Sequence, residues 1–283
     1  MRKKKKEIKL TPDELPYNRY QQLGWVFRKH FFELAGCSLL MGLFALPSAA
    51  WVVLSSSGAF FDQKYLANVL LVYGILSVLL SIFGLGAAGG TYFFHQLSWN
   101  NGASLLDDFF AGIRKNGKRF ALMGFFFFGI VYLLIHLLIY FSNLDEAINA
   151  YLKAASIGIS YAVLFLLFCV YGVLGPLETT YEGGALRNFA IAMRISLANL
   201  YKGVWIFLLC ALPFALFEFI GNVYLAFGVF IVCAAFYFGF ACLLCVLYSN
   251  HLFDIAFNRK QYASAYRKGL VGEGDVNFPP QKK

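Results

Sequence analysis

Long apolar blocks without lysine or arginine constrain the fold of this chain more than any other feature of its sequence. Each block is close to the roughly 20 residues that an α-helix needs to cross the hydrocarbon core of a bilayer. Hydrophobic residues make up 60% of the chain and charged residues 14%, against about 45–50% and about 25% in soluble domains. Because a water-soluble core could not bury so much apolar surface, the sequence predicts a helical membrane protein.

The apolar blocks predict about six transmembrane helices, paired in chain order as three helical hairpins. Their lengths of roughly 20 to 25 residues suit a bilayer with some tilt. The last two are separated only by residues 221–223, which predicts a tight antiparallel turn. The expected spans are Phe31–Leu54, Leu66–Gly86, Phe120–Phe141, Ile157–Leu177, Tyr201–Ile220 and Tyr224–Tyr248. The predicted fold class is therefore all-α, a polytopic membrane helix bundle.

The positive charges predict the orientation of the chain in the cell membrane. All 24 lysine and arginine residues except Lys64 and Lys153 fall in segments that six spans would place on one side. Such segments face the cytoplasm in membrane proteins, so both termini are expected there. The net charge of +9 then describes a surface facing anionic lipid headgroups, and no nucleic-acid partner is expected.

This pattern divides the chain into three parts. Residues 1–30 form a basic cytoplasmic segment, residues 31–250 the six-helix membrane domain, and residues 251–283 a cytoplasmic segment that is expected to be disordered after Gly269. A secretory signal peptide is an alternative interpretation of the first span, because the small residues at 48–50 follow an apolar run. Roughly 30 mostly polar residues precede that run, more than a signal peptide carries, so the span is expected to be retained.

An amphipathic helix on the cytoplasmic side is expected after each hairpin. In the first, apolar residues recur at helical spacing from 105 to 120, and Ser104 with Asp107 forms a capping pair. Phe109 and Phe110 are expected to face lipid or the bundle, while Asp108 or Arg114 faces water. The candidate interfacial segment comprises Asp107, Asp108, Phe109, Phe110, Arg114 and Asn116.

Similar apolar stripes at 186–200 and 253–266 favour an internal repeat of a hairpin followed by an interfacial helix. The sequence FFAGIR at 109–114 matches FAIAMR at 189–194. The match is short, and coincidence remains the alternative explanation.

Several prolines and glycines are expected to shape the helices inside the membrane. Pro47, Gly175-Pro176 and Pro213 are candidate helix breaks, because a proline leaves a backbone carbonyl that a neighbour must satisfy. Such a kink can line a binding site or serve packing alone. The glycines between 84 and 90 make the end of the second span slim, which favours close helix contact and a bend into the interface.

No catalytic, cofactor-binding or metal site is expected. The chain contains no Walker loop, nucleophile elbow or HExxH motif. Its six cysteines lie inside the apolar blocks, where they are interpreted as packing residues. His136, in the outer third of the third span, is interpreted as a packing histidine. The sequence therefore predicts a protein that is not an enzyme and needs no cofactor.

Four stretches of the sequence resemble the YesL-like family of bacterial membrane proteins. They are LFALPSAAW at 43–51, GLGAAGGTYFFHQLSWNNGASLLDDFFAGIRKN at 84–116, RNFAIAM at 187–193 and SNHLFDIAFNRKQYASAYRKGL at 249–270. The family has no assigned biochemical activity and is often associated with carbohydrate-uptake gene clusters. This chain departs from the family pattern at 95–96, 100–102 and 47–49, and the resemblance implies no catalytic residues.

The expected function is that of a non-enzymatic accessory or regulatory membrane protein. The resemblance implies a link to carbohydrate uptake, with a sugar importer or another membrane protein as partner beside the anionic lipid surface. The alternative is a transporter or channel for a small or amphiphilic solute, which the hairpins and proline breaks favour.

Overall fold

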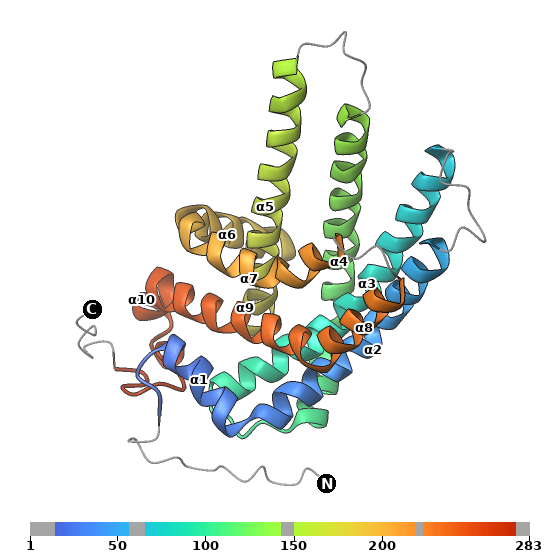
Figure 1. The fold of residues 1–283 in the computed structure, drawn as a ribbon. Coiled ribbons are helices and arrows are strands. Elements are labelled where there is room, and N and C mark those ends of the chain that lie inside the picture. Colours follow the sequence, from blue (N-terminus) through green and yellow to red (C-terminus); the bar gives the residue numbers. More distant parts are fainter. Residues whose placement is uncertain (1–14, 57–65, 143–149, 219–222, 276–283) are drawn as a thin grey trace.

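The computed structural model describes residues 15–56, 66–142, 150–218 and 223–275, and within these ranges the chain is helical with no strands (Figure 1). The π-helical turns η2 and η3 connect α8, α9 and α10 without a break in the helical backbone. The elements are α1 (Arg19–Lys29), α2 (Phe31–Ser56), α3 (Leu66–Ser98), α4 (Leu105–Ser142), α5 (Ala150–Thr180), α6 (Ala185–Ala198), α7 (Leu200–Glu218), α8 (Val223–Val232), η2 (Cys233–Tyr237), α9 (Phe238–Phe253), η3 (Asp254–Asn258), α10 (Arg259–Gln261) and η4 (Ala263–Ala265).

Four helical stretches in the described ranges are long and apolar enough to cross a membrane. They are Phe31–Trp51, Gly74–Ser98, Lys153–Thr180 and Phe227–Gln261. A fifth results if α6 and the start of α7, which meet at a bend of 93°, form one broken span. The all-helical prediction is therefore confirmed, and the helices are compatible with a multi-pass membrane protein.

The first expected amphipathic helix is not a separate element. It forms the beginning of α4, a single helix of 38 residues that also includes the expected third span. An α-helix of that length measures about 57 Å, well beyond the roughly 30 Å of a hydrocarbon core. The helix therefore continues past any single bilayer crossing, and the expected boundary at Phe120 between an interfacial helix and the third span lies inside one continuous helix. In contrast, the second amphipathic segment does form its own helix, α6, with exposed Leu186 and Leu197 on its apolar side.

Glycines allow α3 and α4 to pack at very short distance. A Cβ atom on Gly112 of α4 would lie 2.8 Å from the carbonyl oxygen of Ala88 and 3.1 Å from the Cα of Gly89. A Cβ on Gly84 of α3 would lie 2.7 Å from the carbonyl oxygen of Phe120. The predicted close contact of the glycine-rich stretch is confirmed, and α3 continues beyond it as one helix to Ser98.

The candidate breaks lie inside helices and do not end them. Pro47 lies within α2 and Pro176 within α5, and the backbone at Pro213 is part of α7, although its side chain lies outside the described part. Pro176 cannot donate to the carbonyl of Gly172, and the Ser249 hydroxyl donates to that oxygen at 3.3 Å. The neighbouring helix therefore compensates for the bond that the proline removes.

Helix α9 lies between the two hydrophobic cores of the described chain. One core joins α9 to the start of α2 and the ends of α1 and α3, and includes Leu34, Phe93 and Leu243. The other joins α9 to α5 and α6, and includes Val173 and Phe253. Figure 1 shows α9 crossing the molecule between α1 and α5. Polar residues at the end of α9 are consequently surrounded by several helices.

Candidate functional site

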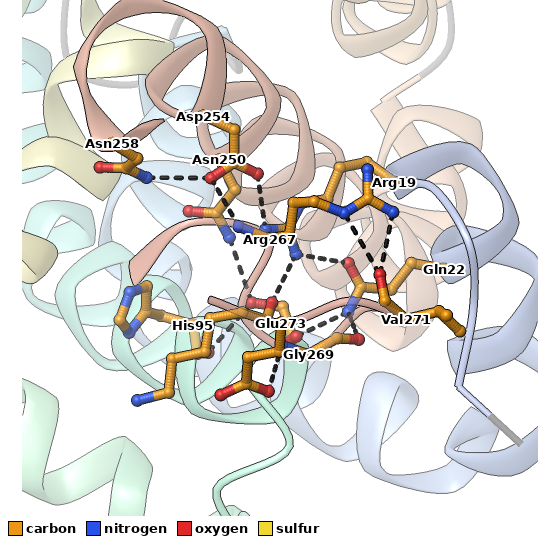
Figure 2. Close-up of polar contacts among 12 residues, drawn as sticks. Arg19, Gln22, His95, Asn250, Asp254, Asn258, Arg267, Gly269, Val271 and Glu273 are labelled. Carbon is orange, nitrogen blue, oxygen red and sulfur yellow. Dashed lines mark hydrogen bonds and ion pairs between the residues drawn. The ribbon is translucent and has the colours of Figure 1, made fainter. Parts of the chain in front are cut away.

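A buried ion pair connects the first helix to the far end of the chain. The Arg19 Nη2 atom of α1 lies 2.9 Å from the Asp254 Oδ2 atom of η3, and their side chains are 5% and 11% exposed. The other carboxylate oxygen, Oδ1, accepts hydrogen bonds from the Asn258 amide and the Arg267 backbone N–H (Figure 2). Burial lowers the pKa of Arg19, and the adjacent Asp254 carboxylate opposes this shift. Asp254 therefore compensates for the burial of the arginine charge.

Further hydrogen bonds extend from this ion pair to the end of α3. The Arg19 Nη1 atom donates to the Gln22 side-chain oxygen at 2.9 Å and to the Lys268 carbonyl at 3.0 Å. Gln22 in turn donates to the Ser98 carbonyl at 2.6 Å, and Asn250 donates to the Ser98 hydroxyl at 3.2 Å (Figure 2). We call the region built by α1, the end of α3, η3 and residues 262–275 the terminal cap.

The end of the described chain is folded into the terminal cap. The Arg267 guanidinium donates to the carbonyls of Tyr17 and Val271. The Val271 backbone N–H donates to the Pro16 carbonyl. Gly269 has φ +78°, and a Cβ atom there would lie 2.0 Å from the Ser98 carbonyl oxygen, so only glycine fits. The expected disorder after Gly269 is therefore wrong up to residue 275, and residues 276–283 lie outside the described part.

A cavity of about 390 Å³ lies at one side of the terminal cap. It is lined by residues just after α3, at and just after the end of α5, and after α10: Trp99, Thr180, Tyr181, Glu182, Tyr262, Ser264, Ala265 and Lys268. The Lys268 ammonium lies 4.4 Å from the centre of the Trp99 ring, at cation–π distance. Three aromatic rings, one cation and one carboxylate thus surround the space that we call the aromatic cavity.

Tyr181 connects the aromatic cavity to the buried ion pair. Its hydroxyl donates to the Asn258 side-chain oxygen, and Asn258 in turn donates to Asp254. Burial raises the pKa of Tyr181 above its ordinary value, so the phenol remains protonated at neutral pH and keeps its donor. The Tyr181 ring also lies 5.2 Å from that of Tyr262. A displacement of the Tyr181 side chain in the cavity wall would therefore disturb Asn258 and, through it, the Asp254 carboxylate of the ion pair.

A buried histidine lies behind the wall of the aromatic cavity. The His95 ring centre is 4.0 Å from that of Trp99, and the residue is 3% exposed. Neither ring nitrogen has a hydrogen-bond partner among the described residues. Nothing in the sequence indicated that His95 is buried, because an isolated histidine has no local pattern that indicates burial. The residue was noted only as a departure from the family pattern.

The candidate interfacial segment lies on α4, outside the terminal cap. Asp107 is exposed and accepts a hydrogen bond from the Ser104 hydroxyl at 3.2 Å, but the predicted capping bond to the Ser104 backbone N–H is made by Asp108 instead. Asp108, expected on the polar side, is buried and accepts the Ser104 backbone N–H at 2.7 Å. The reason is that its carboxylate satisfies a free donor at the start of the helix. Phe109 is fully buried.

The remaining residues of that segment divide between the surface and its edge. Phe110 is 47% exposed, and Arg114 is exposed while Asn116 is partly exposed. The segment thus has one buried aromatic residue, Phe109, while Phe110 and Arg114 are both exposed and lie one helical turn apart.

The residues of the terminal cap were missed because each carries only a weak local signal. Asp254 and Asn258 lie in the segment 253–266, where only the apolar spacing gave a prediction, and Arg19 was counted only as a positive charge. In the described ranges, no group of three or more histidine, cysteine or acidic residues has the arrangement of a metal site. No family model, curated protein or solved structure matches the chain. The function of the terminal cap and the aromatic cavity is therefore inferred from their side chains, contacts and burial.

Proposed function

We propose that this chain is a non-enzymatic accessory or regulatory protein of the cell membrane that binds a partner membrane protein through the aromatic cavity. The observation that carries the proposal is the composition of that cavity, in which Trp99, Tyr181 and Tyr262 adjoin Lys268 and Glu182. Tryptophan and tyrosine dominate binding energy in protein interfaces because they bury much area and keep a polar group. The carboxylate of Asp254, with both oxygens bonded, favours a structural role for the adjoining network.

The proposed partner is the membrane subunit of a sugar importer, in keeping with the resemblance to the YesL-like family. Partner binding at the aromatic cavity would act on a region that joins α1, α3, α5 and the C-terminal segment. Because Tyr181, Asn258 and Asp254 are connected, occupation of the cavity provides a means of regulation. The proposal includes six spans in three hairpins, with the terminal cap on the cytoplasmic side.

Orientation is tested with a reporter enzyme fused after Lys283. We expect activity only for a reporter that works in the cytoplasm, because the lysine and arginine residues concentrate on that side. The matched control carries the reporter in the segment 143–149, which six spans place on the opposite side. Activity of a periplasmic reporter after Lys283 would contradict the proposed topology.

Partner binding is tested with a photo-crosslinking amino acid at position 262 in the full chain in living cells. Tyr262 lines the aromatic cavity and is 43% exposed, so we expect a crosslink to the importer's membrane subunit, identified by mass spectrometry. Trp99→Ala should weaken this crosslink strongly, since truncation of a central aromatic contact costs about 2 kcal/mol of binding free energy.

Two controls accompany the crosslinking experiment. The same amino acid at Tyr151, an exposed residue at the beginning of α5, should give no such product. Trp205→Ala removes an exposed tryptophan of α7 outside the aromatic cavity and should leave the crosslink unchanged. Solute flux through vesicles that contain this chain alone would oppose the accessory role and favour the transporter alternative.

A further inference from the structure

A second cavity, of about 320 Å³, lies between α1, α7 and α9. Its wall is largely apolar, with Leu23, Leu209 and Leu244 contributed by the three helices in turn. Two aromatic residues at its rim are strongly exposed, Tyr20 at 73% and Trp205 at 69%. Tyrosine and tryptophan concentrate where a membrane meets water, so the rim is typical of the headgroup level.

The same cavity contains cationic side chains. Arg19, which is 5% exposed, lines it, and its Nε is a buried donor with no partner among the described residues. Lys202 also lines it, with its ammonium 5.5 Å from the centre of the Tyr201 ring and no ion pair within the described ranges. A buried N–H without an acceptor is costly, so an acceptor that reaches Arg19 through the cavity would be favoured.

We propose that this cavity binds one anionic phospholipid. Its phosphate accepts hydrogen bonds from Arg19 and Lys202, and one acyl chain lies along Leu209 and Leu244. The adjoining Asp254 already balances the charge of Arg19, so Lys202 supplies the attraction for the negative headgroup, with His251 beside it in the lining. Basic pockets between membrane helices bind anionic headgroups in this way. A soluble anion could bind the cationic side chains but would not contact the apolar wall, which an acyl chain covers.

The test titrates phosphatidylglycerol into the full-length protein in detergent and counts bound lipid by native mass spectrometry. We expect one phosphatidylglycerol to bind more tightly than phosphatidylcholine. Lys202→Ala should weaken that binding about fivefold, the effect of one lysine near an anionic headgroup. Ile206→Trp fills the cavity from α7 and should abolish the single bound lipid without changing any charge.

The matched control is Arg187→Ala, which removes an exposed cation of α6 outside the cavity and should leave lipid binding unchanged. Circular dichroism of each variant verifies that the helices remain folded, and Lys202→Arg should restore binding if the ammonium acts through its charge. Equal losses in Lys202→Ala and Arg187→Ala would overturn the proposal, as would full binding in Ile206→Trp. Displacement of the lipid by millimolar inorganic phosphate would show a soluble-anion site instead and would also overturn it.

Discussion

Asp254→Ala should lower the free energy of unfolding by about 3–5 kcal/mol, the usual cost of removing one partner from a buried ion pair. The substitution leaves the Arg19 guanidinium 5% exposed and without its carboxylate. It also removes the acceptor for the Asn258 amide and the Arg267 backbone N–H. Unfolding is followed by circular dichroism in mixed micelles with increasing sodium dodecyl sulfate. Limited proteolysis should cleave residues 262–275 sooner in the variant.

The control for this prediction is Asp107→Ala, which removes an exposed carboxylate whose contact is the Ser104 hydroxyl. Its cost should stay at or below about 1 kcal/mol, the net value of one exposed hydrogen bond. The double variant Arg19→Met with Asp254→Leu should recover much of the lost stability, because no charge remains buried without a partner. An Asp254→Ala variant as stable and as protease-resistant as the wild type would contradict the structural role of the ion pair.

Gly112→Ala should destabilise the packing of α3 against α4 by about 1–3 kcal/mol. The new Cβ would lie 2.6 Å from the Tyr92 Cβ and 2.8 Å from the Ala88 carbonyl oxygen. Backbone atoms of a helix cannot turn aside as the end of a flexible side chain does, so the two helices must separate. Small residues at such contacts provide the close van der Waals packing that associates helices in lipid. The same unfolding titration measures the effect.

Gly129→Ala is the matched control on the same helix. Apart from the helix's own backbone and the two chain neighbours, no heavy atom of the described residues lies within 4 Å of a Cβ at that position. Alanine favours a helix interior over glycine by about 0.5–1 kcal/mol. We therefore expect Gly129→Ala to be neutral or slightly stabilising. Equal effects at the two glycines would show that helix propensity, rather than contact between α3 and α4, governs both.

The glycine-rich stretch of α3 shows which helix contacts the sequence predicted and which it did not. Small residues between 84 and 90 predicted close helix contact, and Gly84 and Gly89 do lie against α4. The pattern did not identify the opposing residue, Gly112, because a list of small residues does not specify which helices meet. Similarly, Pro176 predicted a carbonyl in need of a donor, while only the packing of α9 on α5 identified Ser249 as that donor.

The sequence by itself determined the helices and their apolar character, which is compatible with a multi-pass membrane protein, because those properties depend on residues close together along the chain. Only the tertiary structure decided that α4 continues through the expected boundary, and that Val271, near the end of the described chain, bonds to Pro16 near its start. It also decided the pairing of Arg19 with Asp254, which are 235 positions apart. Each residue alone resembles a surface charge, and burial between α1, α3 and α9 is what makes them partners.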